Sequence, residues 1–552
     1  MKNIGKRVVC LLLVLSLMLG LGVTAFAAND KTVDEAIANT AAYIYKTVAN
    51  PQVGSIGGEW AVLGLARSGY EVPDSYYQDY YETVESYVKA CNGNLHEKKY
   101  TEYSRLIVAL SSIGKDARKV ANYDLTKALG DYDKTIWQGL NGPIWALIAL
   151  DSANYPMPQN PEAKTQATRD MYVQRILECQ LPDGGWSLFG GTAAASSGDG
   201  VSDPDITGMA LQALSNYQNR ADVKKATDEA LACLSKMQDE HAGYASWGTT
   251  NSESVVQVIV ALCSLGISLD DPRFVKGGKT LTDNLLTFYK PGSGFLHTAD
   301  GDGSNQMATE QGFYGLVAIA RAQSKKPTLY RMTDPLKIPE KTGGIAKGQG
   351  LAGKHADVKP VAISAPGTTY TDIVFSPNIT AIEALAARQI INGKNGVFAP
   401  DDSMTRAEFA TIVVKALGLS PKASNVFTDV KSNDWFAGAV GTAHTYGIIT
   451  GKTATTFDPR GTISRQEAAA MVARAAKLCG MDTDVSDATV RDMLAQFSDY
   501  TKTSVWARAA LAFCYQENIL AQSDLTIQPF VAITRAQVAQ MMFNLLGSAN
   551  LL

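Results

Sequence analysis

Apolar and polar positions alternate in blocks along the first 325 residues, and six of these blocks share one pattern. In each, a polar or acidic residue precedes a strongly apolar run that ends at a glycine, an asparagine or a polar turn. The runs recur about every 40–65 residues, which predicts a repeated helical hairpin. They begin at Glu59, Glu102, Gly142, Asp205, Glu253 and Glu310.

The spacing inside these runs indicates packed helices. Apolar side chains follow Ile206 at i+3, i+4, i+7 and i+8, which is the stripe of a helix packed on one face. The run from Glu253 to Leu262 is apolar nearly all round, which is typical of a helix buried on every side. Gly64, Gly208 and Gly315 permit close helix approach. Six inner helices alternating with outer ones predict an all-α domain, a closed α/α toroid of six hairpins.

Parallel inner helices would gather their N-termini around one mouth of the toroid. Acidic side chains suit these positive helix ends, so capping is the simplest interpretation of the acids, with ligand contact as the alternative. Aromatic and amide side chains on the same helices either pack in the core or line a ligand pocket. The candidate pocket residues are Glu59, Trp60, Tyr103, Trp145, Asp205, Glu253, Gln257, Glu310 and Tyr314.

Helical periodicity stops between residues 326 and 369, where prolines, glycines and spaced lysines predominate. This composition predicts an extended, mobile linker after a toroid domain at 28–325. Three copies of a second pattern follow, each with a helix, a glycine-containing loop and a second helix. One hairpin cannot bury its apolar face alone, so the copies should form a single bundle. They span residues 370–425, 426–485 and 495–552, and their second helices should begin at the N-caps Thr405, Ser464 and Thr534.

The pattern of residues 1–27 indicates a secretory signal peptide. A basic segment precedes the apolar run Val8–Val23, and Ala25-Phe26-Ala27 has the shape of a cleavage site. A membrane anchor is the alternative, but the run is short for a span. Removal of this segment takes the formal net charge from −4 to −7, which argues against nucleic acid as a partner. We therefore expect an exported, acidic protein with no stable membrane span.

Six cysteines remain after residue 27, and none lies in a C-x-x-C motif. Cys233 and Cys263 stand in apolar helical segments, where a thiol behaves as a small hydrophobic group, so we favour free thiols. The five histidines form no ligand pattern with cysteine or aspartate. We expect no metal and no cofactor.

The loop Gln180–Trp186 fits a Q-x-x-x-G-x-W repeat, and Gln238–Trp247 is a looser copy. With these motifs, the region resembles the terpenoid cyclase and protein prenyltransferase α/α-toroid superfamily. That resemblance implies the fold and a structural role for the motif. The catalytic patterns of the superfamily are missing, because Asp203-Pro-Asp205-Ile-Thr207 lacks the last acid of D-x-D-D, and no zinc ligands are found. We favour a toroid that binds a small or apolar ligand. The alternative is an enzyme, cyclase-like or glycan-cleaving, that uses the acids at the mouth.

The triple pattern after the linker resembles the S-layer homology (SLH) domain, most specifically in its I-T-R-A-E-type motif. The resemblance implies a three-lobed module that binds pyruvylated secondary cell-wall polysaccharide in Gram-positive bacteria. A carboxylate-bearing sugar suits a guanidinium fork and an aromatic face. We therefore expect glycan contact, with Glu408 and Glu467 bracing helix starts. The candidate glycan-binding residues are Arg406, Arg465, Arg535, Trp435 and Trp506.

The copies differ, and the second is the best candidate for glycan binding. The first has no Trp after its Tyr370-Thr-Asp372, and the third has Gln537 in place of Glu. The sequence therefore predicts a secreted protein of the cell wall or S-layer, anchored non-covalently on the extracellular surface of a Gram-positive-type bacterium.

Overall fold

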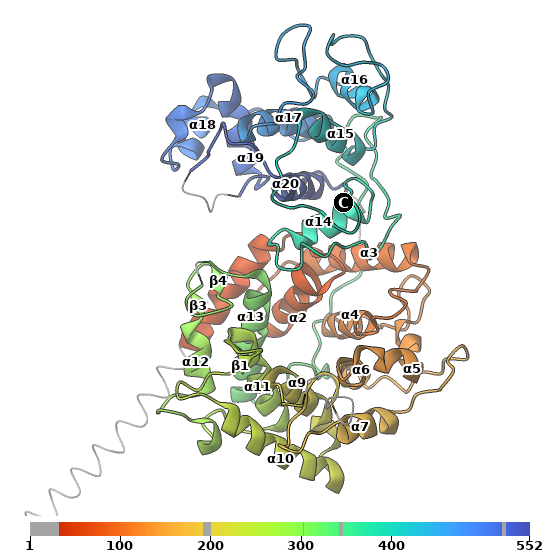
Figure 1. The fold of residues 1–552 in the computed structure, drawn as a ribbon, viewed down its shortest axis with the longest axis vertical. Helices are drawn as coiled ribbons and strands as arrows, with labels where there is room; N and C mark the ends of the chain where they lie inside the picture. Colours follow the sequence, from red (N-terminus) through yellow and green to blue (C-terminus); the bar gives the residue numbers. More distant parts are fainter. Residues whose placement is uncertain (1–31, 191–199, 302, 342–345, 522–525) are drawn as a thin grey trace, which may run out of the picture. The chain divides into compact units, whose positions relative to one another are not determined.

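Helices dominate the protein, as Figure 1 shows, and the predicted all-α class is confirmed. The predicted signal peptide lies outside the residues described by this computed structural model. Those described are 32–190, 200–301, 303–341, 346–521 and 526–552.

The chain divides into two compact units. The first contains Met1–Tyr77 and His96–Pro339, and the second contains Gln78–Leu95 and Glu340–Leu552. Most of the helix α3 (Asp74–Ala90) is thereby grouped with the second unit, where Asp79 and Glu82 accept hydrogen bonds from Lys341 Nζ.

Six inner helices form the core of the first unit, and each contains one of the six predicted apolar runs. Each helix packs against the next along the chain, and the last packs against the first, so the ring closes. The predicted toroid is therefore confirmed. The inner helices are α2 (Trp60–Ser68), α4 (Thr101–Ser112), α6 (Asn141–Ser152), α9 (Pro204–Leu214), α11 (Ser252–Leu265) and α13 (Gln306–Gln323).

An outer element precedes each inner helix. The outer helices are amphipathic: α10 buries Val223, Ala230 and Leu234 and exposes its charged residues. The one that precedes α6 is only one turn long and follows a short 3-10 helix, Leu125–Gly130. Two hairpins also lead into inner helices: β1 (Ala245–Ser246) with β2 (Thr249–Thr250), and β3 (Tyr289–Lys290) with β4 (Gly294–Phe295). In the first unit the outer helices are residues 32–47, α5 (Tyr132–Thr135), α7 (Arg169–Glu178), α10 (Ala221–Met237) and α12 (Leu281–Thr287). The helix α3, which precedes α4 in the chain, is grouped mostly with the second unit.

Glycines let the inner helices approach closely, as their sequence positions predict. A Cβ atom on Gly208 would lie 2.8 Å from the backbone oxygen of Gln257 on the neighbouring α11. A Cβ atom on Gly64 would lie 2.6 Å from the Phe313 ring on α13. Both distances are far shorter than van der Waals contact, so larger residues would push the inner helices apart.

The Q-x-x-x-G-x-W loop joins neighbouring elements. Gln180 Nε2 donates to the carbonyl oxygens of Gly184 and Ala226, and the buried Trp186 donates from Nε1 to Ile176 O at 2.7 Å. These bonds agree with a structural role for the motif.

The second copy of the motif is aligned differently from our prediction. Tyr244, not Trp247, takes the buried aromatic position, because its hydroxyl donates to Leu234 O, ten residues earlier, as Trp186 does to Ile176 O. Trp247 stands at the tip of the β1–β2 hairpin and is 88% exposed.

Residues after α13 cross the ends of the inner helices. Met332 N donates to Ser152 O and Leu336 N donates to Ser112 O. Asp334 accepts from Arg67 at 2.8 Å and from Arg321 at 2.5 Å. This segment therefore supplies donors to carbonyls that helix C-termini leave unpaired.

The second unit is one bundle of three hairpins, as predicted, with the short helix α18 (Asp487–Leu494) inserted before the third. The second helices of the hairpins pack on one another, and each first helix packs on the second helix of another copy. One apolar core runs through all three copies. The hairpins are α14 (Ile379–Ala386) with α15 (Arg406–Ala416), α16 (Ala437–Thr445) with α17 (Arg465–Leu478), and α19 (Arg508–Gln516) with α20 (Arg535–Ser548).

A cycle of three backbone hydrogen bonds joins the copies just before their second helices. Met404 N donates to Ile533 O, Ile533 N to Ile463 O, and Ile463 N to Met404 O, at 3.0–3.2 Å. Each residue donates to one copy and accepts from the other, so the three copies are mutually dependent. The predicted N-caps follow at once, and all three form capping boxes: Thr405, Ser464 and Thr534.

The segment 346–366 is not the mobile linker that its composition predicted. It is extended, but its backbone donates to residues at the ends of the bundle helices: His355 N to Leu478 O, Lys359 N to Leu417 O, and Ser364 N to Ala387 O. These carbonyl oxygens accept no hydrogen bond within their own helices. They are therefore available to the N–H groups of the extended segment.

Within the described residues, no helix is long and apolar enough to cross a membrane. Six cysteines there are free thiols, and five of them are buried.

Replacing Trp186 with Ala should strongly destabilise the first unit, by about 3–5 kcal/mol, because it leaves a cavity and removes the donor to Ile176 O. Trp247→Ala is the matched control and should change stability by less than about 0.5 kcal/mol, because the side chain is exposed. Scanning calorimetry of both variants measures the difference, and equal effects would contradict the assignment of the two tryptophans.

Candidate functional site

The arginines of the second unit lie at the start of the second helices and cross to a neighbouring copy. Arg406 Nε donates to Phe457 O, and its guanidinium lies 4.9 Å from the centre of the Phe457 ring. Its Nη1 forms an ion pair with Glu467 at 2.9 Å. Glu467 also accepts the Ser464 backbone N–H, so it closes a capping box and joins two copies.

Arg535 repeats this arrangement on the first copy. Its Nε donates to Phe398 O, its Nη2 donates to Asn392 O, and its guanidinium lies 4.7 Å from the centre of the Phe398 ring. Arg465 occupies the equivalent position in the second copy, and its backbone N–H donates to Val531 O of the third. The three positions are thus equivalent, although the copies differ in sequence.

An aspartate in each copy shapes the loop that contacts the arginine. Asp372 accepts from the N–H groups of Phe398 and Ala399, and Asp429 accepts from those of Phe457 and Asp458. Asp499 does the same for Ile527 and Gln528 in the third copy. The third copy therefore keeps this geometry despite its changes in sequence.

Exposed aromatic side chains stand before the first helices of the copies. Trp435 is 69% exposed and Trp506 is 58% exposed. The first copy has no Trp at this place in the sequence, but Phe375 lies between Asp372 and α14 and is 86% exposed. The signal that could have identified it is its position as the aromatic residue after the motif aspartate.

The mouth of the first unit gathers the predicted acids, but they do not cap the inner helices. The caps are neighbouring residues: Asp203 accepts from the N–H groups of Asp205 and Ile206, Asn251 from Ser254, and Asn305 from Ala308. Side-chain capping is therefore wrong for Asp205, Glu253 and Glu310, because short side chains at the N-cap position reach the free N–H groups better. Asp205 and Glu253 still lie in the first turn, where the helix dipole favours an acid. Glu102 lies on the rim, paired with Arg105 at 2.6 Å.

Glu59 and Glu310 are completely buried at the junction of α2 and α13. Glu310 Oε1 accepts from Gly57 N at 2.8 Å and from Gln306 Nε2 at 2.7 Å, and Glu59 Oε1 accepts from Gly54 N at 2.9 Å. The second oxygen of each carboxyl has no hydrogen-bond partner among the described residues. Burial raises the pKa of Glu59 to about 7 and that of Glu310 to about 8. Both groups therefore hold a proton at mildly acidic pH.

Asp205, Glu253 and His297 form a second polar cluster at the same mouth. His297 Nδ1 lies 2.9 Å from Glu253 Oε2, and the imidazole is 46% exposed whereas Glu253 is buried. Burial, reinforced by the charge of Asp203, raises the pKa of Asp205 to about 7. The arrangement joins an acid with a raised pKa, a second carboxyl group and a solvent-exposed imidazole. His297 was not among the predicted pocket residues, since it lies 44 positions from Glu253 and no local pattern connects them.

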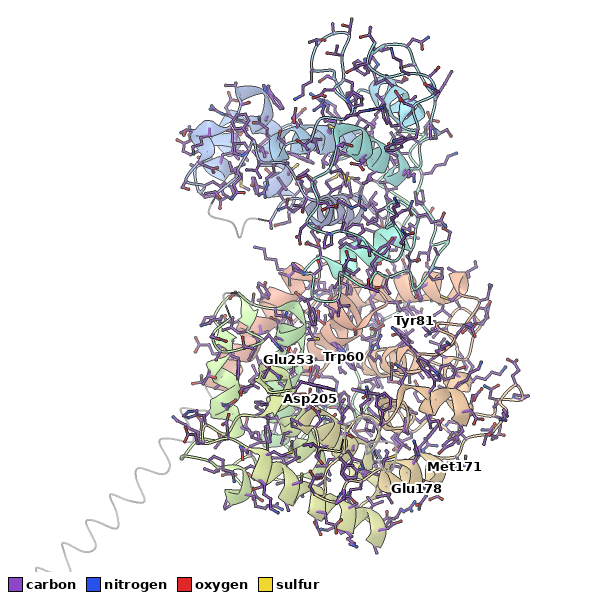
Figure 2. All side chains as sticks on the ribbon, in the orientation of Figure 1. Trp60, Tyr81, Met171, Glu178, Asp205 and Glu253 are labelled. Carbon is purple, nitrogen blue, oxygen red and sulfur yellow. The ribbon has the colours of Figure 1, made fainter. Side chains whose placement is uncertain are left out.

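Aromatic rings fill the space beneath the acids. Trp60 contacts Trp145 at 5.1 Å and Tyr314 at 5.9 Å between ring centres, and Trp145 contacts Tyr330 at 5.7 Å. Gln257 donates to the Tyr314 hydroxyl at 2.9 Å. Figure 2 shows Trp60, Asp205 and Glu253 in the same central region of the unit.

Eight of the nine predicted pocket residues are buried, and Asp205 is half-buried. Trp60 contacts Trp145 and Tyr314, and Gln257 bonds to Tyr314. Tyr103 packs on Tyr100 at 5.2 Å between ring centres. What the mouth can do chemically rests on Asp205, Glu253 and His297, where protons could be given or accepted. No cluster of three or more metal-ligating side chains occurs among the described residues.

The S-layer homology domain family model matches residues 369–410 and 426–469. These ranges are the first two copies of the bundle, and the equivalent contacts of Asp499 and Arg535 extend the repeat to a third. The second unit of this chain therefore carries SLH repeats.

Curated relatives match over part of the chain. The middle cell wall protein of Brevibacillus brevis is 34% identical over 152 residues, 26% of this chain and 14% of the relative. The exoglucanase XynX of Acetivibrio thermocellus is 29% identical over 195 residues, 35% of this chain and 17% of the relative. The chain thus spans less than a fifth of the length of these relatives. Together with the family match, they indicate a bacterial protein associated with the cell surface or cell wall.

Among solved structures, ent-copalyl diphosphate synthase from Streptomyces platensis aligns with a TM-score of 0.30 and 17% identity. The alignment covers 48% of this chain and 50% of that one.

The buried carboxyl groups predict that the first unit loses stability as pH rises from about 5 to 8. Their folded pKa values exceed the unfolded value, so the folded state binds more protons in this range. Each such group contributes a slope of up to about 1.4 kcal/mol per pH unit.

Glu310→Gln should flatten this slope, because the amide is neutral at every pH, while Glu240→Gln at an exposed position is the control. Urea unfolding at several pH values measures the slopes. An unchanged slope in Glu310→Gln would show that Glu310 is ionised in the folded protein.

Proposed function

We propose that this is an exported cell-surface protein, held non-covalently to pyruvylated secondary cell-wall polysaccharide by its three SLH repeats. On this proposal the protein displays the helical ring, which binds a small or apolar ligand. The observation that carries the anchoring proposal is the threefold arrangement of Arg406, Arg465 and Arg535, each at the start of a second helix and beside a loop of another copy.

The chemistry of the ligand supports this arrangement. A pyruvyl ketal carries a carboxylate, which a guanidinium binds with two parallel hydrogen bonds, and a sugar ring offers an apolar face to an aromatic side chain. Trp435 and Trp506 are exposed next to the first helices, where burial alone gives no reason for a tryptophan. Phe375 gives the first copy an exposed aromatic ring as well. All three copies are therefore candidates for glycan contact.

Replacing Phe375, Trp435 and Trp506 together with Ala should weaken binding to purified wall polysaccharide by about tenfold or more, since each ring contributes roughly 0.5–1.5 kcal/mol. Co-sedimentation of residues 28–552 with the polysaccharide measures this binding. Trp137→Ala, on the first unit and 57% exposed, is the matched control and should bind normally.

A companion variant addresses the arginines. Arg406, Arg465 and Arg535 changed to Lys keep their charge and lose the guanidinium fork, so binding should fall while the melting temperature confirms folding. Full binding by both triple variants would contradict the site. Equal binding of the unchanged protein to polysaccharide stripped of pyruvate would contradict the proposal that the pyruvyl group is recognised.

A second candidate function for the first unit is glycan cleavage at the mouth. It is favoured by the cluster of Asp205, Glu253 and His297, in which Asp205 keeps its proton near neutral pH while Glu253 is held by the imidazole. A protonated carboxyl and a carboxylate are the two groups that glycosidases require. The exposed Trp247 lies on the hairpin whose Ser246 donates to Asp203, so an aromatic side chain adjoins the cluster.

This candidate predicts new reducing ends when the protein is incubated with wall glycan near pH 6. Activity should fall at least about 100-fold in Asp205→Asn and in Glu253→Gln, because either change removes one proton-transfer group. Glu102→Gln on the same rim should retain activity. If the unchanged protein releases no reducing ends, glycan cleavage is excluded for that substrate and ligand binding is the remaining function of the ring.

A further inference from the structure

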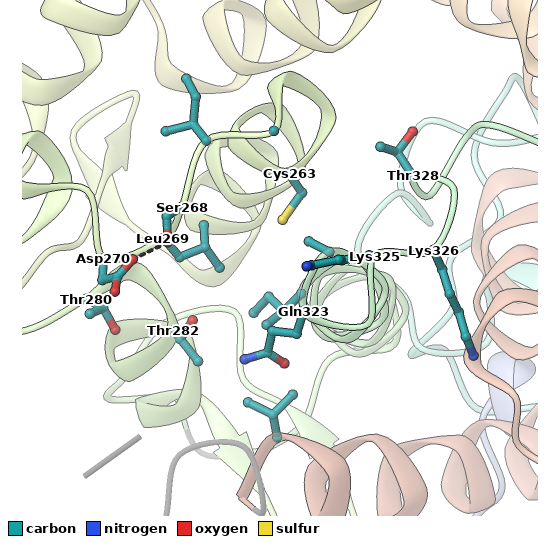
Figure 3. A pocket seen from close by; sticks show the side chains of 15 residues that line it. Cys263, Ser268, Leu269, Asp270, Thr280, Thr282, Gln323, Lys325, Lys326 and Thr328 are labelled. Atoms are coloured by element: carbon teal, nitrogen blue, oxygen red, sulfur yellow. Dashed lines mark hydrogen bonds between the residues drawn. The ribbon is translucent and has the colours of Figure 1, made fainter. Parts of the chain in front are cut away.

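A cavity of about 600 Å³ lies in the first unit, and none of the predicted pocket residues lines it. Its walls come from the last turns of α11 and α13, the residues that follow them, the start of α12 and Val33 on the helix over residues 32–47 (Figure 3). These are the C-terminal ends of the inner helices, whereas the acidic mouth lies at the N-terminal ends. The volume is in the range of sites for small organic ligands.

The cavity has an apolar floor and a polar rim. Val33, Cys263 and Ile319 are buried at its base, and Ile267 and Leu269 are half-buried on one side. Gln323 and Lys325 come from the exposed end of α13. An apolar body with few polar contacts at one end is therefore the ligand shape that these walls fit.

The charged side chain that faces the cavity from its rim is positive. Asp270 is the single carboxylate among the lining residues of the described chain, and it already accepts the hydroxyl of Ser268. Figure 3 shows the ammonium group of Lys325 directed toward Leu269, whereas that of Lys326 points away from the centre. Neither lysine has an ion-pair partner in the described residues. Lys325 therefore offers an unneutralised cation to a bound molecule.

The backbone turns sharply after α13, which places Lys325 at the cavity rim. Lys325 has a φ of 51°, the left-handed conformation that follows a helix end and favours glycine. The end of α11 uses Gly266 for this purpose, with a φ of 68°.

The helix ends do not cancel this charge. C-terminal carbonyls carry partial negative charge, but those around the cavity already accept backbone N–H groups. Gly266 N and Ile267 N donate to Cys263 and Leu262, and Lys325 N and Lys326 N donate to Ala322 and Arg321. The formal charge of Lys325 is therefore the main electrostatic feature of the rim.

We propose that this cavity binds a small amphiphile with one anionic head group, its apolar part against Val33, Cys263 and Ile319 and its head at Lys325. This inference rests on the proposed function of the ring as a ligand-binding domain, and it moves the ligand from the predicted mouth to the opposite end of the inner helices. The anionic head separates this ligand class from a purely apolar one.

The test compares three twelve-carbon probes below their micelle concentrations: dodecanoate, dodecanol and dodecylammonium. Isothermal titration of residues 28–552 should give one site for dodecanoate, weaker binding of dodecanol and weakest binding of the cation. Lys325→Met keeps the apolar stem and should weaken dodecanoate about 2- to 5-fold, the range of one partly exposed charge pair, while leaving dodecanol unchanged. Lys326→Met is the matched control and should bind dodecanoate normally.

A second pair of variants tests the location. Ala322→Trp places a large ring in the cavity from an exposed position and should abolish binding of dodecanoate and dodecanol. Ala232→Trp on the exposed face of α10 is its control, and equal melting temperatures establish that both variants are folded.

The outcomes separate this inference from the proposed function. If dodecanoate binds but Ala322→Trp leaves its affinity unchanged, the cavity assignment is wrong and a ligand-binding ring stands. If Lys325→Met weakens dodecanoate and dodecanol equally, the proposed recognition of an anionic head group by Lys325 is wrong. If none of the probes binds, and native mass spectrometry of the chain from its own envelope shows no ligand, ligand binding by the ring fails as well.

Discussion

Closure is the constraint on which both units depend. A single helical hairpin exposes one apolar face, and each unit buries these faces by joining its last repeat to its first. In the first unit α13 packs on α2, where Gly64 lets the Phe313 ring approach the helix backbone. In the second unit the cycle of hydrogen bonds through Met404, Ile463 and Ile533 joins three copies. Loss of one repeat would expose an apolar face and unpaired backbone groups on both of its neighbours.

Closure also determines where polar chemistry occurs in the ring. Parallel inner helices bring their N-termini to one mouth, where Asp203, Asn251 and Asn305 satisfy the free N–H groups. With the caps supplied by these residues, Glu59 and Glu310 are buried, and burial favours their protonated forms. The second oxygen of each carboxyl accepts no hydrogen bond among the described residues, although that of Glu59 lies 3.9 Å from Arg105 Nε. The opposite end is closed by residues 326–339 beside a cavity with an apolar floor. The two ends of one ring therefore differ in their side chains, with buried carboxyl groups at one end and apolar cavity walls at the other.

The bundle shows how one geometry survives sequence differences between its copies. Arg406 and Arg535 each lie over a phenylalanine ring of another copy, but the third copy has Ile527 at the equivalent position. Asp372, Asp429 and Asp499 still hold all three loops through the same pair of backbone N–H groups. Backbone hydrogen bonds thus preserve the position of each arginine while the side chain beneath it changes.

The sequence alone determined the elements of this protein and the way they repeat. Apolar periodicity identified the six inner helices, and Thr405, Ser464 and Thr534 marked helix starts, because both signals depend on residues close together in the chain. The tertiary structure decided the contacts between residues far apart in the chain, which local signals cannot encode. Trp247 and Tyr244 exchange roles because burial depends on which side chain reaches Leu234 O. His297 meets Glu253 across 44 residues, and the cavity beside Lys325 forms where α11, α12 and α13 end. The segment 346–366 looked mobile because its composition lacks periodicity, yet it binds the ends of helices supplied by distant parts of the chain.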